Sequence, residues 1–442
     1  MSEPLVIVGN GMAAAKLVEK LSTRALGRYA IAVIGEEPQL AYNRVLLSSV
    51  LANEVAQTDI ELKSRRWWRD RGITVLYGHA ATAIDRDIRR VKLASGATIP
   101  YSKLVFATGS RPIVLPIPGR ELPGVMTFRD LHDVDVLKNA GHCNAVVIGG
   151  GLLGLEAASG LAKAGATVTL VHLMDRLMER QLDAEAADML KSAVEMKGIE
   201  VVLNAETARF TGADQVERVE LKDGRIIPAD IVVMAAGIAP NVALARTAGV
   251  SINRGIVVDD GMQTDIPNIY AIGECAEHDG RCVGLVEPAY EQAAVLADRL
   301  GAGEASYKGS IPATNLKVTG VNVFSAGDCL GAPGTEQVLL RDPGLGIYKK
   351  LVIANDRLVG AVLFGDTADG LWYLDLIRTG LPTGAFRNEL AFGRDLVERT
   401  SHLNTSDKEK RDPAEKGLDK SSSGKSGSGK SKMGKNNLGL AA

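Results

Sequence analysis

The stretch LVIVGNGMAAAKLVEKL, from Leu5 to Leu21, determines how the rest of the sequence is interpreted. Its aliphatic start is typical of a buried strand, and it runs through the turn Gly9-Asn10-Gly11 into an alanine- and leucine-rich helix pattern. The next aliphatic run, YAIAVIGEE, occupies residues 29–37. A strand, a helix and a second strand with short connections predict a βαβ unit whose two strands are parallel.

The same pattern occurs a second time, in AVVIGGGLLGLEAASGLAKAG at 145–165 and the strand-like run ATVTLVHL at 166–173. Two later segments also resemble each other. LVFATGSRP at 104–112 and IVVMAAGIAP at 231–240 both end an aliphatic run in a turn of small residues. Two similar halves with alternating strands and helices are typical of the α/β class. We therefore predict two Rossmann-like dinucleotide-binding domains.

The first glycine turn has the residues that a bound dinucleotide requires. Gly9 permits the tight turn, Gly11 lets the backbone approach a pyrophosphate, and Ala14 allows the helix to pack closely on the strand. The helix N-terminus supplies free N–H groups and partial positive charge for the phosphates. Glu36 comes at the end of the second strand, where a carboxylate accepts hydrogen bonds from ribose hydroxyls.

The second glycine turn, Gly149 to Gly154, lies between a strand and a helix in the same way. Its second strand ends in Val171-His172 rather than in an acid, and Arg176 follows. A carboxylate there favours NADH and repels the 2′-phosphate of NADPH, whereas His172 and Arg176 would tolerate or attract that phosphate. The alternative is that neither side chain touches the ligand, so the choice between NADH and NADPH stays open.

The composition excludes several classes of function. A net charge of −2 over 442 residues gives no reason to expect binding to nucleic acid or to an anionic membrane. The four cysteines include no CxxC pair and no spacing typical of a metal or iron–sulfur site. No apolar run approaches the ~18 residues of a membrane-spanning helix, and the acidic start MSEPLVIV is unlike a signal peptide. We expect a soluble, cytoplasmic protein.

The pattern changes from about Ser310. GIYKKLVIANDRLVGAVLFGD, at 346–366, predicts two strands joined by a turn at 355–357. WYLDLIRTG, at 372–380, predicts a helix that ends at a glycine. The final stretch, with SSSGKSGSGKSKMGKNN, is typical of a flexible tail, and a basic tether for an acidic redox partner is the alternative.

On these motifs, the sequence resembles the pyridine-nucleotide-dependent flavoprotein reductases of the glutathione-reductase-like fold. Within them it is most similar to the N-terminal flavoprotein part of assimilatory NAD(P)H nitrite reductase large subunits, and less similar to rubredoxin and ferredoxin reductases. The resemblance covers residues from about Leu5 to about Thr400. Its motifs are GNGMAA, YNRVLLSS, VFATGSRP, VIGGGLLGLE, HLMDRLMERQLD, IYAIGEC and NLKVTGVNVFSAGD.

The resemblance implies FAD and either NADH or NADPH as cofactors. It implies FAD at Gly9, Gly11, Ala14, Glu36 and Arg44, with Thr108 and Gly109 near it, and a second FAD motif at Gly273 and Glu274, where the family normally has Asp. It implies NAD(P)H at Gly149, Gly151, Gly154 and Gly237, with Glu156 close to the nicotinamide. For Glu156 the alternative is a plain carboxylate in the first turn of a helix, favoured by the helix dipole.

The segment IPNIYAIGECAE, at 266–277, reads as a strand that runs into Gly273-Glu274 and then a helix. It indicates that the second domain interrupts the first, which then resumes. We expect an FAD-binding domain in two parts, an NAD(P)H-binding domain, a small α+β domain that forms a dimer or partner interface, and a disordered tail. The FAD-binding domain is expected at 1–117 and 240–309, and the NAD(P)H-binding domain at 118–239. The small α+β domain is expected at 310–400 and the disordered tail at 401–442.

The segment YNRVLLSSVL, from Tyr42 to Leu51, narrows the route of the electrons. Several flavin disulfide reductases carry a redox cysteine about here, and ferredoxin-type relatives often place a lysine beside the flavin where this chain has Ser49. We expect the segment to lie along the FAD, with Arg44 near the flavin and Ser48 and Ser49 opening a helix as cap residues. Without the cysteine, electrons should pass directly to an acceptor outside the chain.

These expectations together describe an FAD-dependent NAD(P)H oxidoreductase. Its acceptor would be a separate redox protein, such as a nitrite or nitrate reductase or a ferredoxin-like protein, in nitrate or nitrite assimilation. A flavin accepts a hydride and can release electrons singly, while the protein contributes position and electrostatics. The alternatives are a flavin-only NAD(P)H oxidase, a ferredoxin- or rubredoxin-type reductase, and a non-enzymatic FAD redox sensor.

Overall fold

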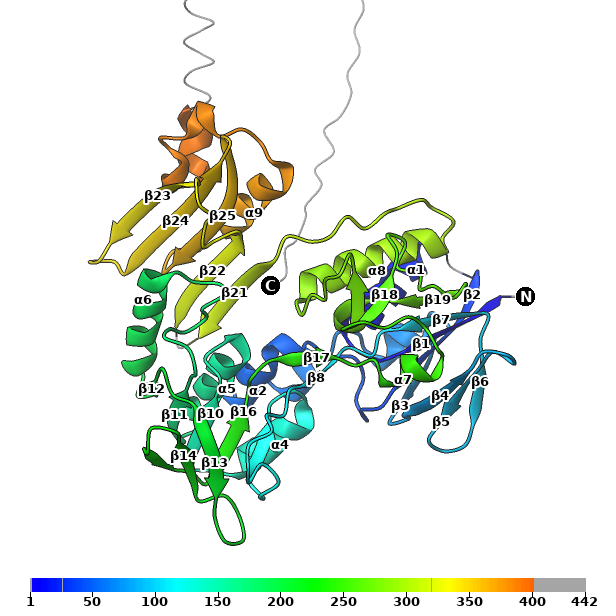
Figure 1. Ribbon diagram of the computed structural model, residues 1–442. Coiled ribbons are helices and arrows are strands. Elements are labelled where there is room, and N and C mark those ends of the chain that lie inside the picture. The colour runs from blue at the N-terminus through cyan, green and yellow to red at the C-terminus, as the bar shows by residue number, and fades with distance from the viewer. Residues whose placement is uncertain (1, 26, 319, 401–442) are drawn as a thin grey trace, which may run out of the picture. The chain divides into compact units, whose positions relative to one another are not determined.

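The computed structural model describes residues 2–25, 27–318 and 320–400 (Figure 1). Residues up to Ala391 form one unit that contains all the sheets below, and the helical residues 394–400 belong to another. The tail expected at 401–442 lies outside the described residues. In the described part of the chain, no helix is long and apolar enough to cross a membrane.

The first glycine turn follows the central strand of a five-stranded parallel sheet, with the order β19-β7-β1-β2-β3. Helix α1 (Met12–Arg24) connects β1 to β2 and buries Ala14, Leu17 and Val18. Because β19 comes from far along the chain, the first domain is completed only after the second, as expected. The strands are β1 (Glu3–Val8), β2 (Tyr29–Gly35), β3 (Thr74–Tyr77), β7 (Lys103–Phe106) and β19 (Ile269–Ala271).

The second glycine turn follows the central strand of a similar sheet, with the parallel order β12-β11-β10-β16-β9. Helix α5 (Leu152–Lys163) connects β10 to β11 and begins at the N-cap residue Gly151. The predicted pair of Rossmann-like domains is therefore confirmed. The strands are β9 (Val125–Thr127), β10 (Asn144–Ile148), β11 (Thr167–Val171), β12 (Glu200–Val202) and β16 (Ile231–Met234), and α4 (Leu131–Asn139) and α6 (Ala184–Glu195) are the other long helices of this half.

Both turns need glycine for the same reason. Gly9 has φ +112° and Gly149 has φ +125°, a region that other residues rarely adopt. A Cβ on Gly9 would also collide with the carbonyl oxygen of Ala107, and one on Gly149 with that of Ala235. Each of these carbonyls follows the neighbouring strand of its own sheet, so the tight turn places the helix N-terminus directly beside the strand ends.

The two segments that carry the chain between the domains pair with each other. β8 (Ser110–Pro112) and β17 (Ile238–Pro240) form an antiparallel two-stranded ribbon, with Ser110 opposite Pro240. These are the ends of the two segments that resemble each other in the sequence. The pairing fixes the register of the outgoing and returning chain at the edge of the cavity described below.

The last large sheet is antiparallel, with the order β21-β22-β25-β24-β23, and α9 packs on it (Figure 1). Asn355 and Asp356, both with positive φ, form the predicted hairpin turn, and Arg357 already belongs to β25. Helix α9 (Gly370–Thr379) ends at Gly380 in the left-handed conformation, as predicted. The strands are β21 (Ala313–Val318), β22 (Val321–Gly327), β23 (Glu336–Asp342), β24 (Ile347–Ala354) and β25 (Arg357–Phe364).

Smaller elements complete the three parts. The longest of these elements is α8, which packs along α1. The Tyr29 hydroxyl of β2 donates a hydrogen bond to the carbonyl of Leu300, the last residue of α8. They are β4 (Ala81–Asp85), β5 (Arg90–Leu93), β6 (Thr98–Pro100), β13 (Thr207–Thr211), β14 (Arg218–Leu221), β15 (Ile226–Pro228), β18 (Ile256–Val258), β20 (Ala276–His278), α2 (Leu47–Leu51), α3 (Arg65–Arg69), α7 (Ala243–Thr247) and α8 (Val286–Leu300).

Two local predictions were wrong. No long helix follows Gly273-Glu274: a single 3₁₀ turn leads into β20, because the Glu277 carboxylate accepts hydrogen bonds from the backbone N–H groups of Arg254 and Gly255 beside β18. Ser48 and Ser49 are not caps, since they lie inside α2. The capping side chain is Asn43, which accepts a hydrogen bond from the Val45 N–H at the preceding 3₁₀ turn.

One carboxylate joins the second domain to the last sheet. Asp183 caps α6 by accepting a hydrogen bond from the Ala186 N–H at 3.2 Å. It also accepts one from the Tyr348 hydroxyl at 2.7 Å and pairs with the Lys350 ammonium at 3.2 Å. Lys350 is only 4% exposed, and the Leu330 carbonyl accepts its other hydrogen bond. A buried ammonium requires such partners, so this cluster ties the two domains together.

We expect Asp183→Ala to destabilise the protein by about 3–5 kcal/mol, because it leaves Lys350 buried without its counter-charge and α6 without its cap. Thermal unfolding of the FAD-loaded protein measures the effect. The matched control is Glu195→Ala, which breaks an exposed pair with Lys191 on the same helix and should cost less than about 1 kcal/mol. Equal midpoints for the two variants would contradict the prediction.

Candidate functional site

A cavity of about 1040 Å³ opens between the first glycine turn, the β8–β17 ribbon and the N-terminal ends of α5 and α8. This volume lies at the top of the range for small-molecule sites, as a molecule the size of a dinucleotide requires. Predicted site residues from both domains line it. They are Gly9, Gly11, Glu36, Arg44, Thr108, Gly109, Glu156, Gly273 and Glu274.

The N-terminus of α1 is open toward this cavity. Its cap residue, Gly11, offers no side-chain hydrogen bond, and a Cβ on Gly11 would meet nothing within 4 Å. Met12 and Ala13 also line the cavity, and in the described part of the chain their backbone N–H groups have no protein acceptor. Unsatisfied N–H groups beside an open space fit a diphosphate. Ala14 does not line the cavity: it is buried beneath the turn.

Arg44 and Glu36 occupy the wall at the end of β2. Glu36 is exposed to the cavity directly after the strand, a position suited to ribose hydroxyls. The Arg44 guanidinium pairs with the Glu37 carboxylate and donates to the Tyr42 hydroxyl at 2.9 Å and the Arg129 carbonyl at 3.0 Å. Arg44 is thus held in place at the cavity by its own neighbours, and Glu37 balances its charge.

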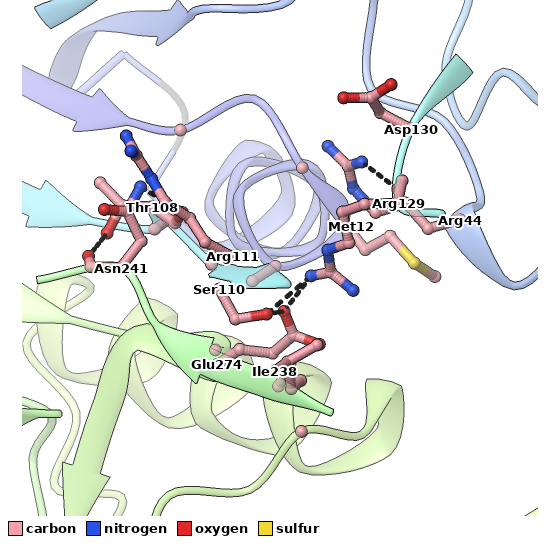
Figure 2. A pocket seen from close by; sticks show the side chains of 18 of the residues that line it. Met12, Arg44, Thr108, Ser110, Arg111, Arg129, Asp130, Ile238, Asn241 and Glu274 are labelled. Atoms are coloured by element: carbon pink, nitrogen blue, oxygen red, sulfur yellow. Dashed lines mark hydrogen bonds and ion pairs between the residues drawn. The ribbon is translucent and has the colours of Figure 1, made fainter. Parts of the chain in front are cut away.

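Figure 2 shows Glu274 joined to Arg129 and Ser110 at the cavity wall. The Ser110 hydroxyl donates to the Glu274 carboxylate at 2.7 Å, and Arg129 donates to the Ser110 oxygen at 2.9 Å and pairs with Glu274. Arg129 could not be predicted from the sequence, because a single arginine outside any glycine motif carries no signal. The extra methylene of Glu274 relative to Asp extends its carboxylate toward this partner.

Thr108 and Gly109 lie where the first domain meets the returning chain. The Thr108 hydroxyl donates to the Asn241 carbonyl at 2.7 Å (Figure 2). The Asn241 N–H donates to the Gly109 carbonyl at 2.9 Å. Asn241 directly follows β17 and also lines the cavity. These bonds hold the ribbon and the cavity wall together, and Asn241 is a second residue that sequence analysis did not find.

Glu156 does not lie in the first turn of α5, where the alternative to a role at the nicotinamide had placed it. With Gly151 as cap, Glu156 lies just beyond the first turn, which contains no acidic residue. The helix dipole acts mainly within the first turn, so it does not account for this carboxylate. The Glu156 carboxyl is buried in the protein where it does not face the cavity, and this burial raises its pKa to about 7. A carboxyl with this pKa can take up or release a proton near neutral pH.

Apart from Glu156, the residues predicted for the nicotinamide dinucleotide lie outside the lining of the large cavity. Gly149, Gly151 and Gly154 form the turn that opens α5, and a Cβ on Gly154 would collide with the Gly149 carbonyl. Gly237 lies between β16 and β17 with a positive φ, and a Cβ there would have only the Ile113 side chain within 4 Å. Its carbonyl accepts a hydrogen bond from the Ile113 N–H at 2.9 Å. The cap of α5 has no side-chain hydrogen bond, so this helix also presents free N–H groups.

His172 is built into the second glycine turn. Its Nδ1 accepts a hydrogen bond from the Gly150 N–H at 3.0 Å, so the ring proton sits on Nε2, which donates to the Glu179 carboxylate at 3.2 Å. Both ring nitrogens are therefore engaged, and Arg176 pairs with Asp175. A carboxylate thus does stand near the end of β11, but Glu179 from the following loop supplies it. The position of Glu179 could not be predicted from the sequence, because only the fold brings this loop back to the second glycine turn.

Other chemistry has no support in the described residues. No group of three or more His, Cys, Asp or Glu side chains there could hold a metal ion. None of the described residues that line the cavity is a cysteine. The four thiols are all free, and burial raises the pKa of Cys275, which lies just behind Glu274. A thiol relay beside the cavity is therefore absent from the described part of the chain.

Comparisons with known proteins agree with this geometry. The family model of pyridine nucleotide-disulphide oxidoreductases matches residues 3–295, and that of the rubredoxin NAD⁺ reductase C-terminal domain matches residues 312–381. The chain is 45% identical over 369 residues to a nitrite reductase [NAD(P)H] of Bacillus subtilis (83% of this chain, 46% of the relative). It is 44% identical over 374 residues to the assimilatory nitrate reductase electron transfer subunit of the same organism (84% and 48%).

Among solved structures, the ferredoxin reductase for the CYP199A2 system from Rhodopseudomonas palustris is similar in fold. It superposes with a TM-score of 0.77 at 28% identity, over 85% of this chain and 95% of that one. The chain spans about half the length of the curated relatives that it matches. The likeness therefore covers the two dinucleotide-binding domains and the small domain after them.

We expect the stability of the protein to depend on pH through Glu156. Because burial raises its folded-state pKa from 4.5 to about 7, the folded protein keeps a proton that the unfolded chain releases. The stability that this proton provides is fully present below the unfolded pKa. It is lost as pH rises through the folded pKa, by about 3 kcal/mol in total.

Glu156→Gln cannot lose a proton, so its thermal midpoint should fall less than that of the wild type between pH 5 and pH 8.5. Differential scanning calorimetry of the FAD-loaded protein measures this difference. Glu195→Gln serves as the control for removing a carboxylate at an exposed site. If Glu156→Gln and the wild type lose stability in parallel, the carboxyl is not protonated in the folded protein.

We also expect NADH to be preferred over NADPH, because the Glu179 carboxylate stands beside the second glycine turn and repels a 2′-phosphate. Glu179→Gln keeps a hydrogen-bond acceptor for His172 and removes the charge. In this variant, kcat/KM with NADH divided by kcat/KM with NADPH should fall about tenfold, which corresponds to 1.4 kcal/mol. The main cause should be tighter binding of NADP⁺. Titration with NADP⁺ gives the Kd, and an unchanged ratio would exclude Glu179 as the discriminating group.

Proposed function

We propose a function for this chain, which belongs to the pyridine nucleotide-disulphide oxidoreductase family: it passes electrons from NAD(P)H to a separate redox protein of nitrate or nitrite assimilation. The chain is an FAD-dependent NAD(P)H oxidoreductase by family, and FAD and NAD(P)H are the cofactors of that family. What is proposed is the acceptor, its setting, and the roles of the residues below.

The cavity without a cysteine is the observation that carries the proposal. In a disulfide reductase, a thiol pair beside the cofactor takes the electrons before they leave. Here the described lining residues contain no thiol, and the segment 42–51 that contributes Arg44 to the wall contains none either. Electrons from the cavity must therefore pass directly to another molecule.

The chain's own residues have defined tasks in this proposal. The FAD supplies hydride acceptance from NAD(P)H and electron release one at a time. The open N-terminus of α1 holds negative charge, and Arg44 is fixed at the cavity wall by Glu37. Glu36 accepts hydrogen bonds from hydroxyls, and the Arg129–Glu274 pair stabilises the cavity wall. Glu156, where α5 meets the cavity, holds or releases a proton at its carboxyl oxygen.

The acceptor is inferred from the relatives. The most similar curated proteins described above are a nitrite reductase and an electron transfer subunit of a nitrate reductase, and this chain corresponds to about half of each. The similar solved structure is a reductase that serves a ferredoxin. A one-electron acceptor protein fits all three, and we propose the small domain after Ser310 as part of its docking surface or of a dimer contact.

Anaerobic mixing of the FAD-loaded protein with NADH tests the proposal. The flavin absorbance should bleach within seconds and return when hexacyanoferrate(III) or a ferredoxin is added. In air without an acceptor, the return should be at least tenfold slower, because dioxygen is not the proposed acceptor.

Two results would overturn it. A flavin that does not bleach with NADH or NADPH would leave only the redox-sensor alternative. A flavin that is reoxidised in air as fast as with hexacyanoferrate(III) would favour the flavin-only oxidase.

A further inference from the structure

A second, small cavity lies between α2 and α5, beside the large one. Its volume is about 20 Å³, which is enough for one water molecule. Apart from Gly160, every residue that lines it is polar: Ser48, Ser49, Glu54, Glu156, Ser159 and Lys163. A space of this size with several polar partners satisfies the conditions under which proteins hold an internal water.

The serine hydroxyls of this small cavity have no protein partner. Within the described residues, no hydrogen bond joins the hydroxyls of Ser48, Ser49 or Ser159 to another group, although Ser159 is only 5% exposed. A serine inside a helix usually satisfies its hydroxyl on the carbonyl one turn earlier. Ser48 and Ser49 are half-buried, so their hydroxyls, like that of Ser159, are open to the cavity rather than enclosed by protein. Hydroxyls without a protein partner around a polar cavity of this size are suitable groups for hydrogen bonding to one water.

The packing of the two helices creates this cavity. Glu156, Ser159, Gly160 and Lys163 lie on one face of α5 at helical spacing, and α2 packs against that face. A Cβ on Gly160 would come within 2.9 Å of the Leu51 side chain and 3.2 Å of the Ser48 carbonyl. Gly160 therefore brings the helices together there, and the small hydroxyl side chains leave the gap.

Glu156 separates the two cavities, because it lines both. In the described part of the chain, its carboxyl has no hydrogen bond or ion pair with protein. The charged residues that face it across the small cavity are Glu54 and Lys163, which pair at 2.6 Å and are 47% and 40% exposed. Helix α5 also packs against the strands β10, β11, β16 and β21. The first three of these strands contain no charged residue, and β21 contains Lys317.

The proposed function creates a need for such a path. Transfer to a one-electron acceptor A follows NAD(P)H + 2 A(oxidised) → NAD(P)⁺ + H⁺ + 2 A(reduced). The acceptor takes only electrons, so one proton is left in the cavity for each NAD(P)H. Glu156 is the one ionisable residue, among those described, that borders both the large cavity and the small polar one.

We propose that the small cavity holds a water that carries this proton from Glu156 to the surface pair Glu54–Lys163, with Ser49 and Ser159 positioning the water. The need for this proton transfer rests on the proposed function. The path of the proton rests on the packing of α2 against α5. Glu156 releases its proton to the water and regains one from the large cavity, so the carboxyl is restored after each turnover. Ser49 thus has a task where related reductases place a lysine.

Infrared difference spectra of the FAD-loaded protein between pH 5 and pH 9 test the water site without turnover. Protonated Glu156 contributes a carboxylic acid C=O band that disappears as pH rises, and Glu156→Gln should lack this band. The double variant Ser49→Ala/Ser159→Ala removes the hydroxyls that hold the water. Its midpoint should move up by at least one pH unit, because the carboxylate loses solvation. Ser192→Ala, on the exposed side of α6, is the control and should titrate like the wild type.

Proton release during turnover tests the route. In a weakly buffered stopped-flow experiment with hexacyanoferrate(III) and a pH indicator, the wild type should release one proton per NADH in step with acceptor reduction. In Glu156→Gln the proton should lag behind by at least tenfold. An infrared midpoint unchanged in the double variant, or proton release in step in Glu156→Gln, would overturn the proposal.

The two proposals fail in different ways. If the wild type reduces no one-electron acceptor, the proposed function is wrong, and the infrared titration still decides whether a water solvates Glu156 in the small cavity. If electron transfer is normal and the infrared midpoint of Glu156 is the same in the double serine variant as in the wild type, the electron-transfer function stands and the proton route is wrong.

Discussion

The close approach of a strand carbonyl to a glycine, made twice, is the constraint on which the rest of the structure depends. The carbonyls of Ala107 and Ala235 leave no space for a Cβ on Gly9 or Gly149. Each helix therefore starts directly beside the end of the neighbouring strand, with its free N–H groups pointing past it. Those same strand ends continue into β8 and β17, which pair at the edge of the large cavity. One packing rule thus places both glycine turns and the β8–β17 ribbon that follows them.

Much of this architecture could be predicted from the sequence, because it depends on local patterns. Aliphatic runs, glycine turns and helix periodicity identified both parallel sheets, the returning strand β19, the hairpin at Asn355–Asp356 and the helix that ends at Gly380. The errors arose where a distant group overrode the local pattern. Glu277 lies in a strand rather than in a helix, because its carboxylate accepts hydrogen bonds from two backbone N–H groups beside β18. The cap near Ser48 is Asn43, because a 3₁₀ turn precedes α2.

The sequence predicted the glycines and several charged residues that line the cavity, but not the groups that hold such residues in place. Arg129 and Asn241 lie outside every motif, and Glu179 lies in a motif that indicated no role for it. All three reach the site only because the chain crosses between domains or loops back. The motif HLMDRLMERQLD illustrates the difference. It served as a sign of resemblance, yet in the structure its His172 and Glu179 flank the second glycine turn and its Asp183 caps α6. A spacing in sequence cannot show that these contacts share one loop.

Asp183 has a consequence for how such proteins recombine during evolution. It belongs to the nicotinamide-side half, whereas Tyr348 and Lys350 belong to the last sheet, and all three must match for Lys350 to stay buried. The small domain is therefore not a freely exchangeable module. A graft from a relative would succeed only if it brought a hydroxyl and a cation at these two places, or if the acceptor carboxylate were replaced at the same time.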